Sequence, residues 1–303
     1  MRRDVIGRVA PWLQMHWDWR AAGNFIAGGT GSGLLIVAML GGIQPERAPI
    51  ALGLGCIGAG LGCVWAEIGR PWRALNVFRH ARTSWMAREA FAAAGVFACG
   101  AAAVLHAARP LQALLAIGAA AFLYSQARML QAAKGIPAWR HPRVVPLICA
   151  TGLAEGAGLL LLYGAVAPWP TVPRWLAWIF VLLPAARAAC WTGYRRGVHA
   201  RGAPRAALDV LDGLDRPLRA ADVAATLLAA ASLWLPAAVW PRIVAALVVL
   251  IAGWTLKATL IRRAAFNQGF ALVLAPERGV GGCGPPARPG WNARAPRELE
   301  PAP

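Results

Sequence analysis

Charged residues are scarce in this chain of 303 residues. Asp, Glu, Lys and Arg together account for only 15% of the sequence, whereas about one-quarter of a typical soluble domain is charged. Hydrophobic residues make up 58%, and the mean hydropathy is +0.50. This composition excludes an ordinary soluble domain and predicts an integral membrane protein.

Histidine and cysteine are too few and too scattered to hold a prosthetic group. Of the five histidines, only His106 falls inside an expected membrane span, so no two histidines share a depth at which they would ligate a haem. The six cysteines contain no C-x-x-C pair, and no zinc or iron–sulfur ligand set is apparent. We therefore expect neither haem nor metal in this chain.

Apolar stretches long enough to cross a bilayer are abundant. A spanning helix needs about 20 predominantly apolar residues, and eight segments meet this requirement with short polar connections between them. They are residues 21–41, 49–68, 86–107, 110–131, 145–166, 173–193, 220–239 and 242–262. The sequence thus predicts an all-α integral membrane protein with eight transmembrane helices within residues 21–274.

The segments outside these spans differ in composition. Residues 1–20 contain three tryptophans and are expected to lie at the membrane interface. Residues 275–303 are rich in Pro, Gly and Arg and are expected to be disordered. The connection between the sixth and seventh spans is the longest, and its aspartates among apolar residues favour a short surface helix. Within the first span, the run Gly28-Gly-Thr-Gly-Ser-Gly33 predicts close helix packing.

Most basic residues fall on one side of this topology. The formal net charge is +18, and 25 of the 31 Lys and Arg residues lie before the first span, after the last span or in alternate connections. The opposite connections contain only Arg47, Arg109, Arg174 and Arg242. The positive-inside rule therefore places both termini in the cytoplasm. The bias accounts for the net charge without a nucleic acid partner.

Ionisable residues also gather at the cytoplasmic ends of the expected spans. Such groups are costly inside a membrane unless they are paired or used. We interpret the set as a polar pocket, with snorkelling side chains and structural ion pairs as the alternative. Its members are Glu67, Arg88, Glu89, Arg128, Arg187 and Lys257.

Glu155 differs from this set because it lies near the middle of the fifth span. Two roles remain open for it, namely neutralising Arg187 and carrying protons. A carboxylate at mid-membrane and eight spans also suit a proton-coupled transporter, which is the alternative function. Against a transporter, the other ionisable residues lie near one face, and no pair of interrupted helices is apparent.

The chemistry that suits such a pocket is quinone binding. A quinone head group needs hydrogen-bond partners at two oxygens and a route for two protons, and carboxylates and basic side chains beside an apolar wall supply both. The chain has no expected electron carrier of its own. Electrons are therefore expected to pass to or from a partner at the same face.

Five segments carry a resemblance to a known family. They are Trp17-Asp-Trp-Arg-Ala-Ala-Gly-Asn24, Gly69-Arg-Pro-Trp-Arg-Ala-Leu-Asn76, Thr83-Ser-Trp-Met-Ala-Arg-Glu89, Ile136-Pro-Ala-Trp139 and Ala265-Phe-Asn-Gln-Gly-Phe270. Over roughly residues 15–275 the chain resembles membrane anchor subunits of the dimethyl-sulfoxide-reductase type, within the polysulfide- and nitrite-reductase membrane-subunit group. The finer pattern is most similar to anchor subunits of phenylacetyl-CoA:acceptor oxidoreductases.

The resemblance implies eight helices in two four-helix bundles, without haem, in the cytoplasmic (inner) membrane of a bacterium. It also implies quinone or quinol as the exchangeable ligand. The implied partners are a ferredoxin-like subunit with four [4Fe–4S] clusters and a molybdopterin catalytic subunit. In such a complex the anchor is a non-catalytic subunit at which the quinone half-reaction takes place.

Two residues correspond to the family's quinone site. Glu67 stands where the sulfoxide-reductase branch has a histidine implicated in quinol binding, and Glu89 matches a glutamate of that branch. Either side chain can accept and donate a proton. An inert tether without a quinone site is a further alternative. Partner docking is expected at Arg70, Arg73, Asn76, Arg79 and His80.

Overall fold

The computed structural model describes most of the chain as long helices. It describes residues 10–42, 47–66, 76–78, 80, 82–106, 108–166, 174–234, 239–270, 275–276, 283–284 and 290–292. Within these residues the long helices are α2 (Trp19–Gly41), α3 (Arg47–Trp65), α4 (Trp85–Leu105), α5 (Arg109–Ala132), α6 (Val144–Val166), α7 (Arg174–Arg201), α8 (Arg205–Trp234) and α9 (Trp240–Ala258). A π-helical turn, η2 (Thr259–Arg263), extends α9.

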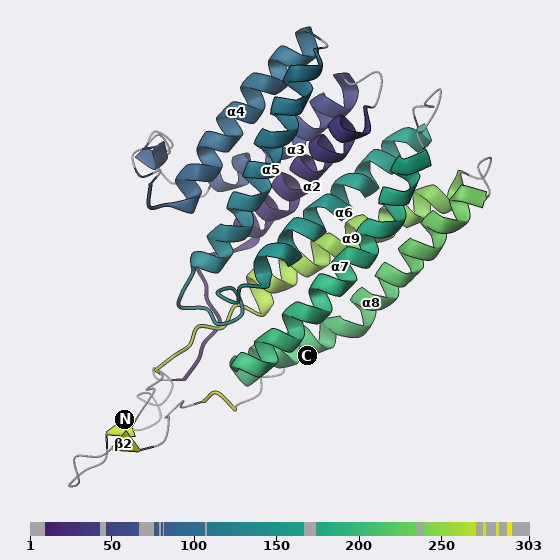
Figure 1. Cartoon of the computed structure of the whole chain (residues 1–303). Coiled ribbons are helices and arrows are strands. Elements are labelled where there is room, and N and C mark those ends of the chain that lie inside the picture. The colour runs from purple at the N-terminus through teal and green to yellow at the C-terminus, as the bar shows by residue number, and fades with distance from the viewer. Residues whose placement is uncertain are drawn as a thin grey trace, which may run out of the picture.

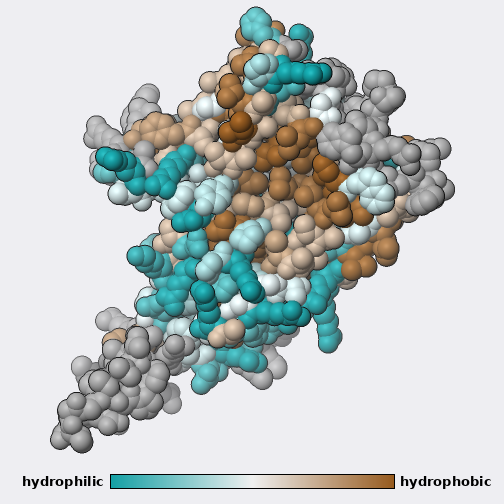
Figure 2. Space-filling view, in the orientation of Figure 1, coloured by the Kyte–Doolittle hydropathy of each residue, from teal (hydrophilic) through white to brown (hydrophobic). Residues whose placement is uncertain are grey.

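Six of these helices are long and apolar enough to cross a membrane. They are α2 to α6, together with α9 extended by η2. The face of the molecule seen in Figure 2 is hydrophobic over the middle of the helices, and its hydrophilic residues gather mostly at the lower end, with some at the upper tip. The protein is therefore an all-α, multi-pass membrane protein.

The two remaining helices, α7 and α8, extend farther than the sequence predicts. Only residues 202–204 join them, so the expected long connection is wrong, and the helix expected around Asp209, Asp212 and Asp215 is the first part of α8. The physical reason is charge pairing between the facing helices. Arg195 forms ion pairs with Asp212 and Asp215, and these pairs hold the facing sides of the two helices together.

The helices form two groups of four that are joined through α2 and α6. The first group contains α2 to α5 and the second contains α6 to α9 (Figure 1). Glycines allow the backbones of α2 and α6 to touch. A Cβ at Gly33 would overlap the carbonyl oxygen of Gly152, and a Cβ at Gly156 would overlap the backbone of Gly33. The close helix packing predicted from the glycine run is confirmed.

Segments from both ends of the chain meet at the end of the bundle where α2 begins and η2 ends, here called the loop end. Leu13 and Phe266 form an antiparallel β-bridge. Gln14 Nε2 donates to the carbonyl of Ile261 at 3.1 Å. These bonds fix the entry to α2 beside the exit from α9.

Part of the C-terminal segment also packs at the loop end. Trp291 is buried, its indole nitrogen donates to the carbonyl of Gln268 at 3.0 Å, and its own carbonyl accepts from the Arg205 amide at 2.6 Å. Two short strands, β1 (Ala275–Pro276) and β2 (Cys283–Gly284), pair antiparallel. Of this segment the structure describes only these short stretches, and in the last of them the Trp291 ring is buried against the bundle.

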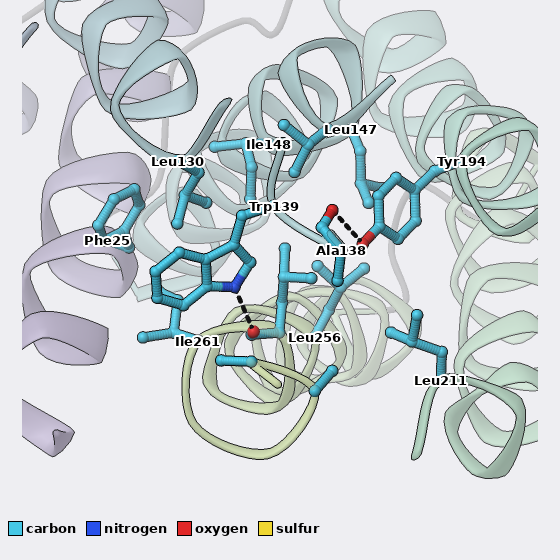
Figure 3. Close-up of a cluster of buried hydrophobic side chains, with 14 of the residues drawn as sticks. Phe25, Leu130, Ala138, Trp139, Leu147, Ile148, Tyr194, Leu211, Leu256 and Ile261 are labelled. Carbon is cyan, nitrogen blue, oxygen red and sulfur yellow. Dashed lines mark hydrogen bonds between the residues drawn. The ribbon is translucent and has the colours of Figure 1, made fainter. Parts of the chain in front are cut away.

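The connection between α5 and α6 is fixed in a hydrophobic cluster that both groups share. Trp139 Nε1 donates to the carbonyl of Leu260 at 2.8 Å, and the Tyr194 hydroxyl donates to the carbonyl of Ala138 at 2.9 Å (Figure 3). Phe25 of α2 packs in the same cluster. Hydrogen bonds and hydrophobic packing therefore hold the loop end together.

Candidate functional site

Glu89 lies in a buried cluster formed by three helices of the first group. The Ser84 hydroxyl accepts from the Ala87 amide at 3.3 Å and so fixes the start of α4. Glu89 follows in the second turn and is only 4% exposed. Its Oε1 accepts from Asn24 Nδ2 of α2 at 3.2 Å, and Gln126 of α5 bonds to the same Asn24 residue.

The Glu89 cluster contains unused hydrogen-bond acceptors. Gln126 Nε2 donates to the Asn24 backbone carbonyl at 3.1 Å. The side-chain carbonyl oxygens of Asn24 and Gln126 are buried without a hydrogen-bond partner in the structure. No basic side chain among the described residues forms an ion pair with Glu89. The site therefore combines one carboxyl group with two acceptors that favour an incoming O–H or N–H donor.

A second cluster surrounds Lys257 of α9 and lies between the two groups. Lys257 Nζ contacts Glu155 Oε2 of α6 at 2.6 Å, and both side chains are completely buried. The same oxygen accepts from the Thr30 hydroxyl of α2 at 2.8 Å, and Trp254 Nε1 donates to that hydroxyl at 3.1 Å. Glu155 Oε1 has no partner in the structure.

A third cluster joins Arg187 of α7 to Asp222 of α8. Arg187 Nε donates to Asp222 Oδ1 at 2.8 Å, and Nη1 donates to the carbonyl of Val249 at 2.9 Å. The two side chains are 0% and 1% exposed. Of the two roles left open for Glu155, direct neutralisation of Arg187 therefore falls to Asp222 instead.

Glycines of α2 bring the Glu89 cluster close to the Lys257 cluster. A Cβ at Gly28 would lie 2.5 Å from Gln126 Nε2. A Cβ at Gly29 would collide with Lys257 Nζ and lie 3.7 Å from Gln126 Oε1. The absence of side chains at these positions leaves Gln126 and Lys257 on either side of one short stretch of α2.

Arg88 and Arg128 lie on an aromatic surface beside these clusters. Their guanidinium carbons lie 4.2 Å and 4.6 Å from the ring centroid of Trp85. Arg128 Nη1 also donates to the Tyr124 hydroxyl at 3.1 Å. Arg88 is exposed and Arg128 is partly buried. Both guanidinium groups lie on the ring of Trp85 and outside the three buried clusters.

The expected docking residues are only partly described. Asn76 and His80 lie in short helical turns between α3 and α4 and are exposed. Glu67, Arg70, Arg73 and Arg79 lie outside the residues that the structure describes. The six expected pocket residues therefore do not form one described pocket, and the buried ones are divided among three clusters.

Sequence reasoning missed several members of these clusters, among them Asn24, Gln126 and Asp222. Asn24 and Gln126 are neutral amides, and Asp222 lies close to the expected start of its span. A polar residue within an apolar stretch is the signal that would have identified each of them. Within the described residues, no three His, Cys, Asp or Glu side chains gather as possible metal ligands.

No protein-family model matches the chain, and no curated protein sequence matches it.

Proposed function

We propose that this chain is the haem-free membrane anchor subunit of a molybdopterin oxidoreductase complex. In this role it binds quinone or quinol and exchanges electrons with an iron–sulfur subunit. The observation that carries the proposal is the buried Glu89 carboxyl group beside the unpartnered carbonyl oxygens of Asn24 and Gln126. The five family-like segments quoted above add to this support.

The chemistry of the Glu89 cluster suits a quinol. A quinol carries two hydroxyl groups, and the unpartnered amide oxygens of Asn24 and Gln126 are acceptors for such donors. Oxidation releases two electrons and two protons, and the Glu89 carboxylate is positioned to accept one of these protons. The electrons leave to a cluster of the iron–sulfur partner at the loop end. Quinone reduction uses the same groups in the opposite direction.

The second proton is assigned to the Lys257–Glu155 pair in this proposal. Gln126 and Lys257 both lie against Gly29, so the two clusters are adjacent across α2. Within the pair, Lys257 contacts Glu155 Oε2, and the other carboxylate oxygen, Oε1, is buried without a partner and can accept a hydrogen bond. A water molecule between such groups would transfer the proton without movement of the helices.

The finer membrane arrangement belongs to the same proposal. All eight long helices cross the bilayer as two four-helix bundles, with both termini in the cytoplasm of a bacterium. The Arg187–Asp222 pair supports this for α7 and α8, because it neutralises the ionisable groups at their centres. Reporter fusions after Arg47 and Arg109 should report the outer side, and a cytoplasmic signal at both would reverse the orientation.

A proton-coupled transporter is the second candidate function, favoured by the fully buried Lys257–Glu155 pair. The two functions make different demands on the isolated chain. A transporter acidifies or alkalinises reconstituted vesicles in response to its substrate without any partner. An anchor subunit shows no such activity alone.

Purification from native membranes tests the anchor assignment. The tagged chain, extracted in mild detergent, should bring with it a ferredoxin-like polypeptide and a large polypeptide in stable ratio. Elemental analysis of that complex should find iron and molybdenum or tungsten, with acid-labile sulfide. A chain that purifies alone, with neither metal, from membranes of cells that use it for growth would contradict the assignment.

A further inference from the structure

A basic cavity lies at the loop end, between α7 and the connection from α5 to α6. It encloses about 400 Å³, and its lining includes His141 and Arg143 from the connection and Arg196 and Arg201 from α7. Gly197 lets the buried His141 ring pack directly against α7, because a Cβ there would lie 2.5 Å from His141 Nε2. None of these residues belongs to the buried clusters of the proposed quinone site.

The last turns of α7 have two faces with different electrostatics. Arg195 and His199, one turn apart, face α8 and pair with Asp212. Arg196 and Arg201 face the cavity instead, and within the part of the chain that the structure describes neither forms an ion pair with a carboxylate. The first face is neutralised, whereas the second face keeps its positive charge.

Arg143 adds a third positive charge to the cavity. Its Nη1 donates to the carbonyl of Gly193 at 2.6 Å, which directs the guanidinium toward α7. Like Arg196 and Arg201, it is exposed and forms no ion pair with a described carboxylate. Three guanidinium groups that line one cavity and have no acidic partner among the described residues favour an anion with several acceptor oxygens, such as a phosphate group.

An apolar groove continues from this cavity toward the hydrocarbon region. It has a volume of about 490 Å³, shares Arg196 with the cavity, and is lined farther along by Ala188 and Ala189 of α7 and Val223 of α8. Arg219 of α8 also lines the groove. Ala188 and Ala189 lie about two turns from Arg196 along α7, and Val223 lies about one turn from Arg219 along α8. The side chain of Val223 is 58% exposed, so the groove opens on the outer surface of the helix bundle.

We propose that Arg143, Arg196 and Arg201 bind the phosphate group of an anionic phospholipid whose acyl chain lies in the adjacent groove. Charge complementarity identifies the head group, and the continuity of the cavity with an apolar groove identifies a lipid over a free phosphate ion. Basic pockets between transmembrane helices are a recurrent setting for anionic lipids. The proposal rests on the membrane crossing of α7 and α8 proposed above, and it is independent of the proposed quinone site.

Native mass spectrometry and lipid titration of the purified full chain in detergent test the site. The probes are phosphatidylglycerol, phosphatidylcholine and glycerol phosphate. The unaltered protein should prefer phosphatidylglycerol to phosphatidylcholine. The double variant Arg196→Gln/Arg201→Gln should lose about tenfold or more of the affinity for phosphatidylglycerol. The matched control is Arg262→Gln/Arg263→Gln, which removes two exposed positive charges at the same end but outside the cavity.

The groove is tested separately with Ala189→Trp, which fills it with a large ring at an exposed position. This variant should weaken phosphatidylglycerol binding and leave glycerol phosphate binding unchanged. Equal losses in the Arg196/Arg201 and Arg262/Arg263 variants would reduce the effect to general surface charge and overturn the proposal. Glycerol phosphate that binds as tightly as the lipid, with no effect of Ala189→Trp, would overturn the assignment to a lipid.

Discussion

Lys257 and Glu155 form an ion pair in the interior of the helix bundle, with 2.6 Å between Nζ and Oε2 and no exposure of either side chain. The pair joins α9 of the second group to α6, and Thr30 of α2 completes it from the first group. Because two opposite charges are held together away from water, removal of either side chain would leave the other charge buried and uncompensated.

Removal of one partner should therefore cost more than removal of both. Lys257→Met leaves the Glu155 carboxylate buried without its cation, and we expect a loss of about 3–5 kcal/mol in the free energy of unfolding. The double variant Lys257→Met/Glu155→Leu should recover most of that loss. Unfolding in mild detergent measures both variants. A double variant that is less stable than either single variant would show that the pair is not the relevant interaction.

The Arg187–Asp222 pair predicts a difference between two aspartates of the same helix. Among the described residues, Asp222→Ala leaves the Val249 carbonyl as the remaining hydrogen-bond acceptor of the buried Arg187 guanidinium, and we expect a loss of about 3–5 kcal/mol. Asp212 is partly exposed and pairs with Arg195, so Asp212→Ala should cost about 1 kcal/mol or less. Thermal unfolding of the two variants compares them directly, and similar midpoints would contradict the buried pairing.

The contact between α2 and α6 predicts an asymmetry among glycines. A Cβ at Gly156 would overlap the backbone of Gly33 and Leu34, so Gly156→Ala should destabilise the bundle by about 1–3 kcal/mol. A Cβ at Gly55 meets no atom within 4 Å, so Gly55→Ala should be neutral or stabilise its helix by about 0.5–1 kcal/mol. Unfolding midpoints test this pair. Equal effects would mean that the two helix groups are not joined at Gly156.

His141 predicts a dependence of stability on pH. Burial, followed by the nearby Arg201 and Arg143 charges, lowers the pKa of His141 below its ordinary value; Tyr194 packs against the ring at 6.0 Å. The folded protein thus holds His141 neutral, whereas the unfolded chain protonates it near pH 6.5. Its contribution to stability is complete above about pH 6.5 and is lost progressively as the pH falls below that value.

The measurement is the unfolding midpoint of delipidated protein between about pH 7.5 and about pH 5.5. This range lies above the ordinary pKa values of carboxylates. The midpoint should fall on acidification. His141→Gln keeps a polar side chain without the titration and should show a shallower decrease. An unchanged slope in His141→Gln would assign the pH dependence to other groups.

Most helices could be located from the sequence because a long apolar stretch marks each of them. The first span was expected at residues 21–41, and α2 occupies Trp19–Gly41. The end of α7 and the start of α8 could not be predicted from the sequence, for a physical reason. Their charged residues look like a solvent-exposed connection in isolation, and only the pairing of Arg195 with Asp212 and Asp215 across the two helices makes them helical extensions.

The candidate site was accessible only in part. Counting residues along each helix gave depths for Glu155, Arg187 and Lys257, but not the rotation of each helix about its axis. That rotation decides that Glu155 meets Lys257 and that Arg187 meets Asp222. Glu89 was identified because it is charged, whereas its partners Asn24 and Gln126 carry no charge and stand out less in an apolar stretch.

The central claim is that quinone exchanges electrons and protons at Glu89. The most direct test compares quinone-linked turnover with turnover driven by a soluble dye, in the same membranes, for the intact complex and its Glu89→Gln variant. The dye reacts with the catalytic partner and bypasses this chain. Asp212→Asn serves as the control, because it removes a carboxylate outside the buried clusters. We predict that Glu89→Gln lowers quinone-linked turnover by at least about tenfold, since general acid–base groups typically contribute about 10²–10⁴-fold, while dye-linked turnover and assembly remain. Full quinone-linked turnover in Glu89→Gln would contradict the account.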